Sequence, residues 1–362
     1  MEEDTKKQPD GSFKYYRFNR FYALIVVAAI LAALILFVLL ALCVSPQRSP
    51  LADYEWSASD KYDAELYPTL TVAPDGRFKI MQVSDLHILS GGALDRKSLD
   101  FVGRAIDAAQ PDLLVVTGDL SLAADNAYAF SVWNDFISEK GVKWAFVFGN
   151  HDTDEGCPVS RDEQLAYYQT LPGCLAYDAV PEMYGSGTHN LPIYASKGND
   201  IKFNLWLFDS NDYDRENGGY DYVHQDQIDW YVKTSEELEK KAGHLVPSIA
   251  FQHIIVPEVA ELLVDSPFSG ENAISKKLNG QNKLLMLKPG KTSGMMLEFP
   301  CPSNTNSGQF AAWKSRGDVI AASFGHDHIN NFIGNVDGID LVMCPGVTFQ
   351  SYGRYISRAV RI

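Results

Sequence analysis

From Phe78 onward, apolar strand-like runs alternate with helix-like segments, and this alternation constrains the fold more than any other feature of the chain. Strands are predicted at Phe78–Val83, Leu113–Thr117, Trp144–Phe148, Phe203–Phe208, Ser248–Gln252, Val319–Phe324 and Leu341–Cys344. Helices are predicted at Asp95–Ala109, Ala127–Lys140, Arg161–Thr170, Gln225–Ala242 and Ser307–Arg316. Such alternation is typical of a layered α/β fold in which helices cover a largely buried sheet.

Polar residues directly follow five of the predicted strands. In chain order they are Asp85, His87, Asp119, Asn150, His151, Asp152, His253, His326 and His328. Open α/β sheets place their ligands beyond the carboxyl ends of their strands. We therefore expect these side chains to converge on one site.

Carboxylates, imidazoles and an Asn carbonyl are together suited to a pair of cations. A carboxylate can bridge two metal ions, an imidazole offers a neutral nitrogen, and an amide oxygen adds a ligand without adding charge. Two ions about 3.5–4 Å apart can polarise a phosphoryl group, generate hydroxide near neutral pH and stabilise the leaving oxygen. Glycines 118, 149 and 325 would permit tight turns close to the site.

The ordered motifs D-x-H, G-D, G-N-H-D, a lone H and G-H-x-H resemble those of the calcineurin-like metallophosphoesterases, from about residue 78 to residue 350. Three neighbouring segments resemble a short branch related to the purple acid phosphatases: Val223–Tyr231 (VHQDQIDWY), Asn306–Phe310 (NSGQF) and Gly325–Asn331 (GHDHINN). The resemblance implies an α/β/β/α sandwich over residues 70–362 that hydrolyses phosphate esters with two metal ions.

The resemblance also implies a role for each site residue. One metal would be bound by Asp85, His87, Asp119 and His328. The second would be bound by Asp119, as a bridging ligand, and by Asn150, His253 and His326. His151 would bind no metal but would stabilise or protonate the leaving oxygen, with Asp152 holding its ring. A metal-bound hydroxide would attack phosphorus in line.

One position departs from the purple acid phosphatases, which bind ferric iron through a Tyr three residues after the G-D aspartate. Leu122 occupies that position here, and His87 stands where those enzymes have a residue that is not a ligand. We therefore expect no iron–tyrosinate colour. Two divalent ions are expected, and manganese, iron, zinc or a mixed pair would all suit the ligands.

Near the N-terminus, Phe21–Val44 is a run of 24 residues without charge. A helix rises about 1.5 Å per residue, so such a run can span a bilayer core of about 30 Å. The apolar region of a cleaved signal peptide is shorter, and it follows a shorter lead. We therefore predict a cytoplasmic tail (1–20), a transmembrane helix in the lipid bilayer (21–44), a stalk (45–69) and the catalytic domain (70–362).

Charge and cysteine content bear on partners and compartment. The chain carries 31 basic and 46 acidic side chains, with a net charge of −15. Nucleic-acid-binding proteins present a basic surface, so we expect no nucleic acid partner. In an oxidising compartment, a short loop closed by Cys157 and Cys174 is the preferred disulfide, and other pairings with Cys301 and Cys344 stay open.

Three functions are compatible with the sequence. The first is a phosphomonoesterase that acts on a phosphoprotein or a small phosphate ester. The second is a phosphodiesterase that acts on a cyclic nucleotide or a lipid headgroup, because the same metals can serve both reactions. The third is a non-catalytic binding protein on the same fold.

The charges that flank the apolar run predict its orientation. Lys14, Arg17 and Arg20 precede it and only Arg48 follows closely, and positive flanks usually stay cytoplasmic. The catalytic domain should then lie outside the cytoplasm or in a lumen. We expect a protease added to intact cells or sealed vesicles to digest residues 60–362; protection of this part would show that the orientation is wrong.

Overall fold

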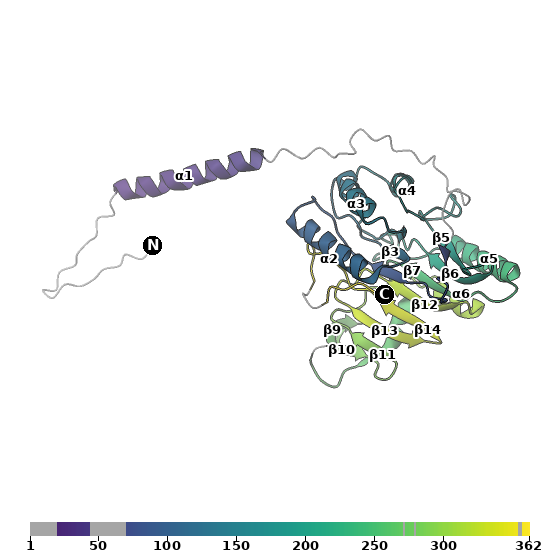
Figure 1. Cartoon of the computed structure of the whole chain (residues 1–362). Coiled ribbons are helices and arrows are strands. Elements are labelled where there is room, and N and C mark those ends of the chain that lie inside the picture. Colours follow the sequence, from purple (N-terminus) through teal and green to yellow (C-terminus); the bar gives the residue numbers. More distant parts are fainter. Residues whose placement is uncertain (1–19, 44–69, 271, 279, 354–356) are drawn as a thin grey trace. The chain divides into compact units, whose positions relative to one another are not determined.

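The computed structural model describes residues 20–43, 70–270, 272–278, 280–353 and 357–362 (Figure 1). The chain divides into two units, residues 1–48 and 49–362, which we describe separately. The predicted stalk (45–69) and the predicted tail (1–20), except Arg20, lie outside the described residues.

The first unit contains helix α1, Arg20–Cys43, where the apolar run predicted a helix. Its described side chains, over residues 24–35, are exposed, as Leu24 (67%) and Ile35 (59%) illustrate. Within the described part of the chain, no helix combines the length and apolar character needed to cross a bilayer. The membrane anchor therefore stays a prediction.

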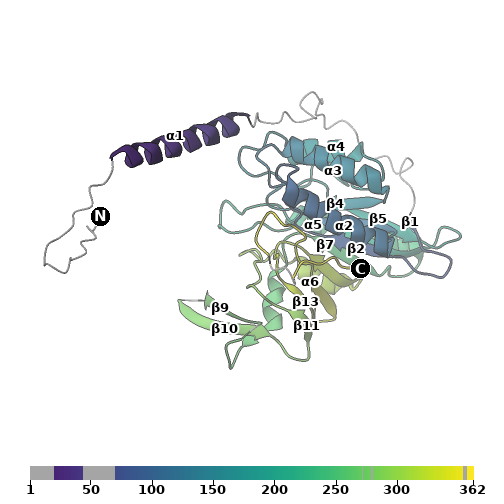
Figure 2. The same cartoon turned by 60° about the vertical axis from the view of Figure 1, so that its left-hand side comes forward.

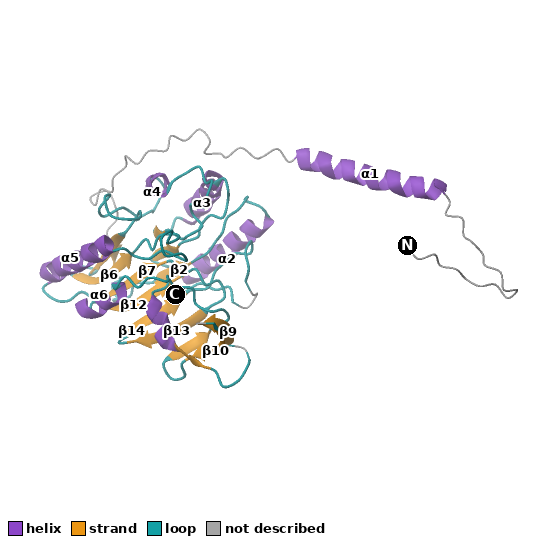
Figure 3. Cartoon of the chain, turned by 180° about the vertical axis from the view of Figure 1, so that it is seen from behind, coloured by secondary structure: helices purple, strands orange, loops and turns teal. Residues whose placement is uncertain are grey.

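The second unit contains three sheets and five α-helices in its described residues (Figure 3). The smaller parallel sheet has the order β2 (Ile80–Val83), β3 (Leu113–Thr117), β4 (Trp144–Val147). The larger sheet has the order β1 (Leu70–Thr71), β5 (His189–Tyr194), β6 (Ile201–Leu207), β7 (Ser248–Gln252), β12 (Val319–Phe324), β14 (Ile339–Met343), β13 (Asn331–Val336), β11 (Thr292–Met295). Strands β6, β7, β12 and β14 run parallel.

The helices are α2 (Ala93–Ala109), α3 (Asn126–Lys140), α4 (Arg161–Gln169), α5 (Gln225–Ala242) and α6 (Gln309–Arg316). A 3-10 helix, η1 (Pro257–Leu262), leads into a third, antiparallel sheet of β8 (Leu263–Asp265), β10 (Gln281–Leu287) and β9 (Ala273–Leu278). Figure 2 shows β9 and β10 as a hairpin at the edge of this unit.

The apolar cores explain the layers. Successive side chains of a strand point to opposite faces. Leu114 and Val116 of β3 pack in one core with α2, α3 and α4, whereas Leu113 and Val115 pack in another core against the large sheet. Side chains of α5 and α6, such as Trp313, cover the other face of that sheet. The predicted α/β/β/α order is therefore observed, and burial on both faces explains the continuous apolar runs.

All the predicted strands and helices of this unit occur, with ends that differ by at most two residues. The sequence did not reveal β1, β5, β8, β9, β10, β11 and β13. Strand β9 reads AISKKL and is partly exposed, so it has no apolar run or strict alternation that could be recognised. Pairing with β10, and not its own pattern, makes it a strand.

The preferred disulfide between Cys157 and Cys174 is wrong. Among the described residues, Cys157, Cys174, Cys301 and Cys344 are all free thiols. Cys174 is buried in the core beside Trp144, with which it forms a β-bridge. The thiol of Cys157 instead donates to the carbonyl of Ala123 at 3.5 Å. The two cysteine side chains thus lie in different surroundings.

Candidate metal centre

Strand ends from both sheets meet at one place, where the predicted site residues lie. The loops after β2 and β3 are joined by a bond from the N–H of Asp85 to the carbonyl of Gly118 (3.1 Å). The loops after β12 and β7 are joined by a bond from the N–H of Gly325 to the carbonyl of His253 (3.1 Å). His326 links the two sheets, because its N–H donates to Oδ2 of Asp85 at 3.2 Å.

Asp85, His87 and His328 form a first group, whose possible ligand atoms all lie within 4.8 Å of one another. The Nε2 atoms of His87 and His328 are 3.0 Å apart, and Oδ1 of Asp85 lies 3.4 Å from Nε2 of His328. Nδ1 of His328 lies 3.1 Å from the carbonyl of Tyr352. A carbonyl can only accept, so Nδ1 carries the proton and Nε2 of the neutral ring turns its lone pair to the group.

Asp119, His253 and His326 form a second group with the same limit of 4.8 Å. Nε2 of His253 lies 3.3 Å from Oδ2 of Asp119 and 3.2 Å from Oδ1 of Asn150. Nδ1 of His253 donates to the carbonyl of Thr117 at 2.8 Å, which again leaves Nε2 as the free nitrogen. The structure therefore brings all seven predicted ligands together.

One oxygen of Asp119 faces both groups. Oδ2 lies 3.3 Å from Nε2 of His253 in the second group and 3.6 Å from Nε2 of His87 in the first. Its other oxygen, Oδ1, accepts the N–H of His151 at 2.8 Å, which fixes the orientation of the carboxylate. This is the arrangement required of a carboxylate that bridges two cations.

The donor atoms fit metal ions in spacing and in chemistry. With metal–nitrogen bonds of about 2.0–2.1 Å, two ligands of one ion lie about 3.0–3.4 Å apart. In the first group, two separations of 3.0 and 3.4 Å lie in this range, and the third, between Nε2 of His87 and Oδ1 of Asp85, is 3.7 Å. Oδ1 of Asp85 is buried and has no hydrogen-bond partner among the described residues, which is costly unless a cation binds it. The residues present therefore fit a pair of divalent cations.

The electrostatics of the cluster favour positive charge. Burial has the largest single effect on the pKa of Asp85 and would raise it, but His328, His87 and His253 together hold that pKa well below its usual range. Burial opposes ionisation of Asp119 as well, but His253 and His87 together lower the pKa of Asp119. In return, Asp119 and Asp85 raise the pKa values of His253 and His328 to about 9, against the effect of burial. Bound cations would replace these protons.

The backbone at the site is unusual. Four site residues have positive φ angles: Asp85 (53°), His87 (51°), Asp119 (53°) and His326 (73°). Residues other than glycine rarely adopt this region, and such conformations cluster at functional sites where the surrounding structure holds them. A Cβ atom at Gly149 would clash with the carboxylate of Asp119. The predicted close approach of backbone at Gly149 is therefore confirmed.

The predicted contact between Asp152 and the ring of His151 is wrong. Nδ1 of His151 instead lies 2.8 Å from Oδ2 of Asp154. The chain turns over residues 151–154, so the side chain three positions on returns to the ring. The buried carboxylate of Asp152 accepts three backbone N–H groups, at 2.8–3.0 Å, from Gly149, Asp119 and Ser121. Asp152 therefore holds the loops, and Asp154 holds the ring.

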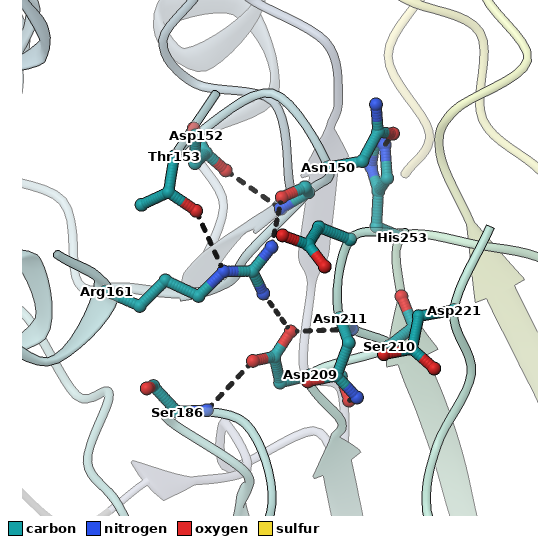
Figure 4. Close-up of polar contacts among 12 residues, drawn as sticks. Asn150, Asp152, Thr153, Arg161, Ser186, Asp209, Ser210, Asn211, Asp221 and His253 are labelled. Carbon is teal, nitrogen blue, oxygen red and sulfur yellow. Dashed lines mark hydrogen bonds and ion pairs between the residues drawn. The ribbon is translucent and has the colours of Figure 1, made fainter. Parts of the chain in front are cut away.

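A buried ion pair that the sequence analysis missed supports the same loop (Figure 4). Nη1 of Arg161, at the start of α4, lies 2.6 Å from Oδ1 of Asp209, just beyond β6. Nη2 of Arg161 donates to the carbonyl of Gly149 at 2.8 Å. Asp209 also accepts the N–H groups of Ser186 and Asn211 at 2.8 and 2.9 Å. The chain carries many Arg and Asp residues, so no sequence signal singled out this pair.

Two segments that contributed to the resemblance, Val223–Tyr231 and Asn306–Phe310, each contain a glutamine whose side chain donates a hydrogen bond to a neighbouring segment. Nε2 of Gln227 in α5 donates to the carbonyl of Asp209 at 2.9 Å. Nε2 of Gln309 in α6 donates at 2.8 Å to the side chain of Gln252, which precedes His253. Gln227 thus ties α5 to the loop after β6, and Gln309 ties α6 to the end of β7, which His253 follows.

Comparisons with known proteins agree with this geometry. A family model described as calcineurin-like phosphoesterase matches residues 78–330. The chain is 29% identical over 326 residues to "Probable inactive purple acid phosphatase 14" of Arabidopsis thaliana, covering 80% of this chain and 75% of that protein. It is 27% identical over 287 residues to "Phosphatase DCR2" of Saccharomyces cerevisiae, covering 71% of this chain and 45% of that protein.

A solved structure of a dimetal phosphatase from Danio rerio is similar with a TM-score of 0.47 and 12% identity, over 75% of this chain and 88% of that one. The match to the family model is sufficient to assign the family, because it covers more than half of the chain and includes both metal groups. The chain is similar to a plant protein named as a purple acid phosphatase, and it belongs to the calcineurin-like phosphoesterase family.

Proposed function

We propose that this protein is a metal-dependent phosphomonoesterase that acts on a phosphoprotein or a small phosphate ester. The observation that carries the proposal is the position of Oδ2 of Asp119, 3.3 Å from His253 and 3.6 Å from His87. One carboxylate oxygen that faces two groups of buried ligands is suited to a pair of ions and not to a single one.

Two divalent cations at such a site polarise a phosphoryl oxygen and lower the pKa of water. The chain's own residues position the other participants. Oδ2 of Asp119 lies toward both groups, and Oδ1 of Asn150 lies beside His253 of the second group. His151 is partly exposed, and Asp154 fixes its ring through Nδ1 at 2.8 Å, which leaves Nε2 to donate a proton to the leaving oxygen.

The names of the relatives point in two directions. The Arabidopsis protein is named as a probable inactive enzyme, and the yeast protein as a phosphatase. Activity in this chain is supported by its complete set of ligands and by His151, all of which the site requires. We therefore favour catalysis over a binding role.

We also infer that residues 21–44 hold the catalytic unit at a membrane, with that unit outside the cytoplasm or in a lumen. The run is uncharged, and it forms a helix over Arg20–Cys43. Large apolar side chains such as Leu31 (53%) and Leu34 (54%) are exposed on this helix, as a lipid-facing surface requires.

A substrate panel tests the reaction. With added manganese or zinc, we expect the full-length protein to hydrolyse an aryl phosphate faster than a bis-aryl phosphate. A preference for the diester would assign a phosphodiesterase of cyclic nucleotides or lipid headgroups. Turnover of neither ester by protein that holds both metals would assign a non-catalytic binding role.

Replacement of the bridging carboxylate tests the metal pair. We expect Asp119→Asn to lose both ions by elemental analysis and to lower turnover at least about 100-fold, because the amide cannot supply the bridging negative charge. Asp337→Asn is the matched control, since that carboxylate is exposed and pairs with Lys314. Unchanged turnover in Asp119→Asn would argue against two-metal catalysis.

The corrected partner of His151 gives a further test. We expect Asp154→Asn to lower turnover about tenfold, with metal content and melting temperature unchanged, because the ring loses its charged partner. The loss should be greatest for esters with poor leaving groups, which need the proton most. Asp152→Asn should instead lower the melting temperature, because an amide cannot accept all three backbone N–H groups. An Asp154→Asn variant with wild-type turnover on every ester would refute the assignment.

A further inference from the structure

Two tyrosines between β6 and α5 lie against the second metal group. Nδ2 of Asn150 donates to the hydroxyl of Tyr213 at 3.0 Å. The ring of Tyr220 meets the ring of His326 edge-on, with centroids 4.2 Å apart. The two tyrosine rings are within 29° of parallel, with centroids 5.8 Å apart, and their backbones form a β-bridge. A hairpin, residues 212–221, thus places two aromatic rings beside the site.

The hairpin is held in place by hydrogen bonds at its turn. The carboxylate of Asp214 accepts the N–H groups of Glu216 and Asn217 at 3.0 and 2.8 Å. From outside the hairpin, Thr305 donates to Asp214 at 3.2 Å, and Asn304 donates to the carbonyl of Gly218 at 2.8 Å. The rings are therefore ordered before a ligand binds, which lowers the entropic cost of binding.

Part of the surface of Tyr213 and Tyr220 is exposed and can contact a ligand. Tyr213 is 36% exposed and Tyr220 is half-buried. The hydroxyl of Tyr213 accepts a bond from Asn150, and its own proton has no acceptor in the described part of the chain. A tyrosine hydroxyl can accept and donate at once, so Tyr213 can still donate to an ester oxygen.

We propose that the Tyr213–Tyr220 hairpin is the subsite for the alcohol part of the phosphate ester and that it favours a planar aromatic group. The inference rests on the proposed function and specifies its substrate class as aryl phosphates. Aromatic rings stack on one another in preferred geometries that a saturated ring of the same size cannot adopt. Contact with Asn150 and His326 places this surface next to the phosphoryl group that those residues would face.

The test compares phenyl phosphate with cyclohexyl phosphate, using the full-length protein with added manganese. The ratio of the two kcat/KM values is measured for wild type and for Tyr220→Leu, so the different intrinsic reactivities of the esters cancel. We expect the leucine variant to lower this ratio about threefold to tenfold. Tyr220→Phe should keep the wild-type ratio, because the ring remains. Tyr213→Leu repeats the test if the first variant does not fold.

A tyrosine outside the hairpin is the control. Tyr184 is 50% exposed and stacks on His224, so Tyr184→Leu removes a comparable ring and should leave the ratio unchanged. Metal content is measured for every variant, because Tyr220 contacts His326. An equal ratio in wild type, Tyr220→Leu and Tyr213→Leu, with metals retained, would overturn the subsite while leaving the proposed function intact.

A binding measurement separates the two proposals. Calorimetric titration of the manganese-loaded protein with phenylphosphonate and with cyclohexylphosphonate needs no turnover. We expect tighter binding of the phenyl compound to wild type and loss of that preference in Tyr220→Leu. If wild type shows this preference but hydrolyses neither ester, the subsite is supported and the proposed activity fails.

Discussion

The site depends on two ionised carboxylates buried where the two sheets meet. Asp85 and Asp119 are at most 1% exposed, and taking a carboxylate out of water is expensive unless positive charge or hydrogen bonds compensate. Protonated histidines can supply that charge, and so can cations held by the same nitrogens. Because both carboxylates follow strands of the small sheet while His253 and His326 follow strands of the large one, this compensation also joins the two sheets.

The surroundings of the carboxylates serve to fix their positions. Asp152 accepts N–H groups from two different loops, and Arg161 ties the carbonyl of Gly149 to Asp209 beyond β6. Both residues bond to backbone groups of the loops. Asp152 accepts the N–H of Asp119, whose φ angle is positive, and such conformations persist only where the surroundings over-determine them. The two metal groups therefore depend on the hydrogen bonds of Asp152 and Arg161, which hold the loops in position.

Prediction succeeded where one chemical pattern repeats and failed where a side-chain direction decides. The helices of the second unit and seven of its strands could be read from apolar runs because both faces of the two sheets are buried, whereas the sequence did not reveal seven other strands. The partner of His151 could not be read, because Asp152 and Asp154 are both close in sequence and only the turn decides which one meets the ring. The paired cysteines failed for a similar reason, since loop length says nothing about where each thiol points.

The sequence by itself determined the layered α/β architecture, the candidate metal-ligating residues and the chain order of the motifs, because hydrophobic period and donor chemistry are local properties of residues. Only the tertiary structure decided which oxygen of Asp119 faces both groups, which acid holds His151 and where Tyr213 and Tyr220 lie. Those facts depend on distances between segments far apart in the chain. Such distances are set by the packing of two sheets and their loops, and no local pattern encodes them.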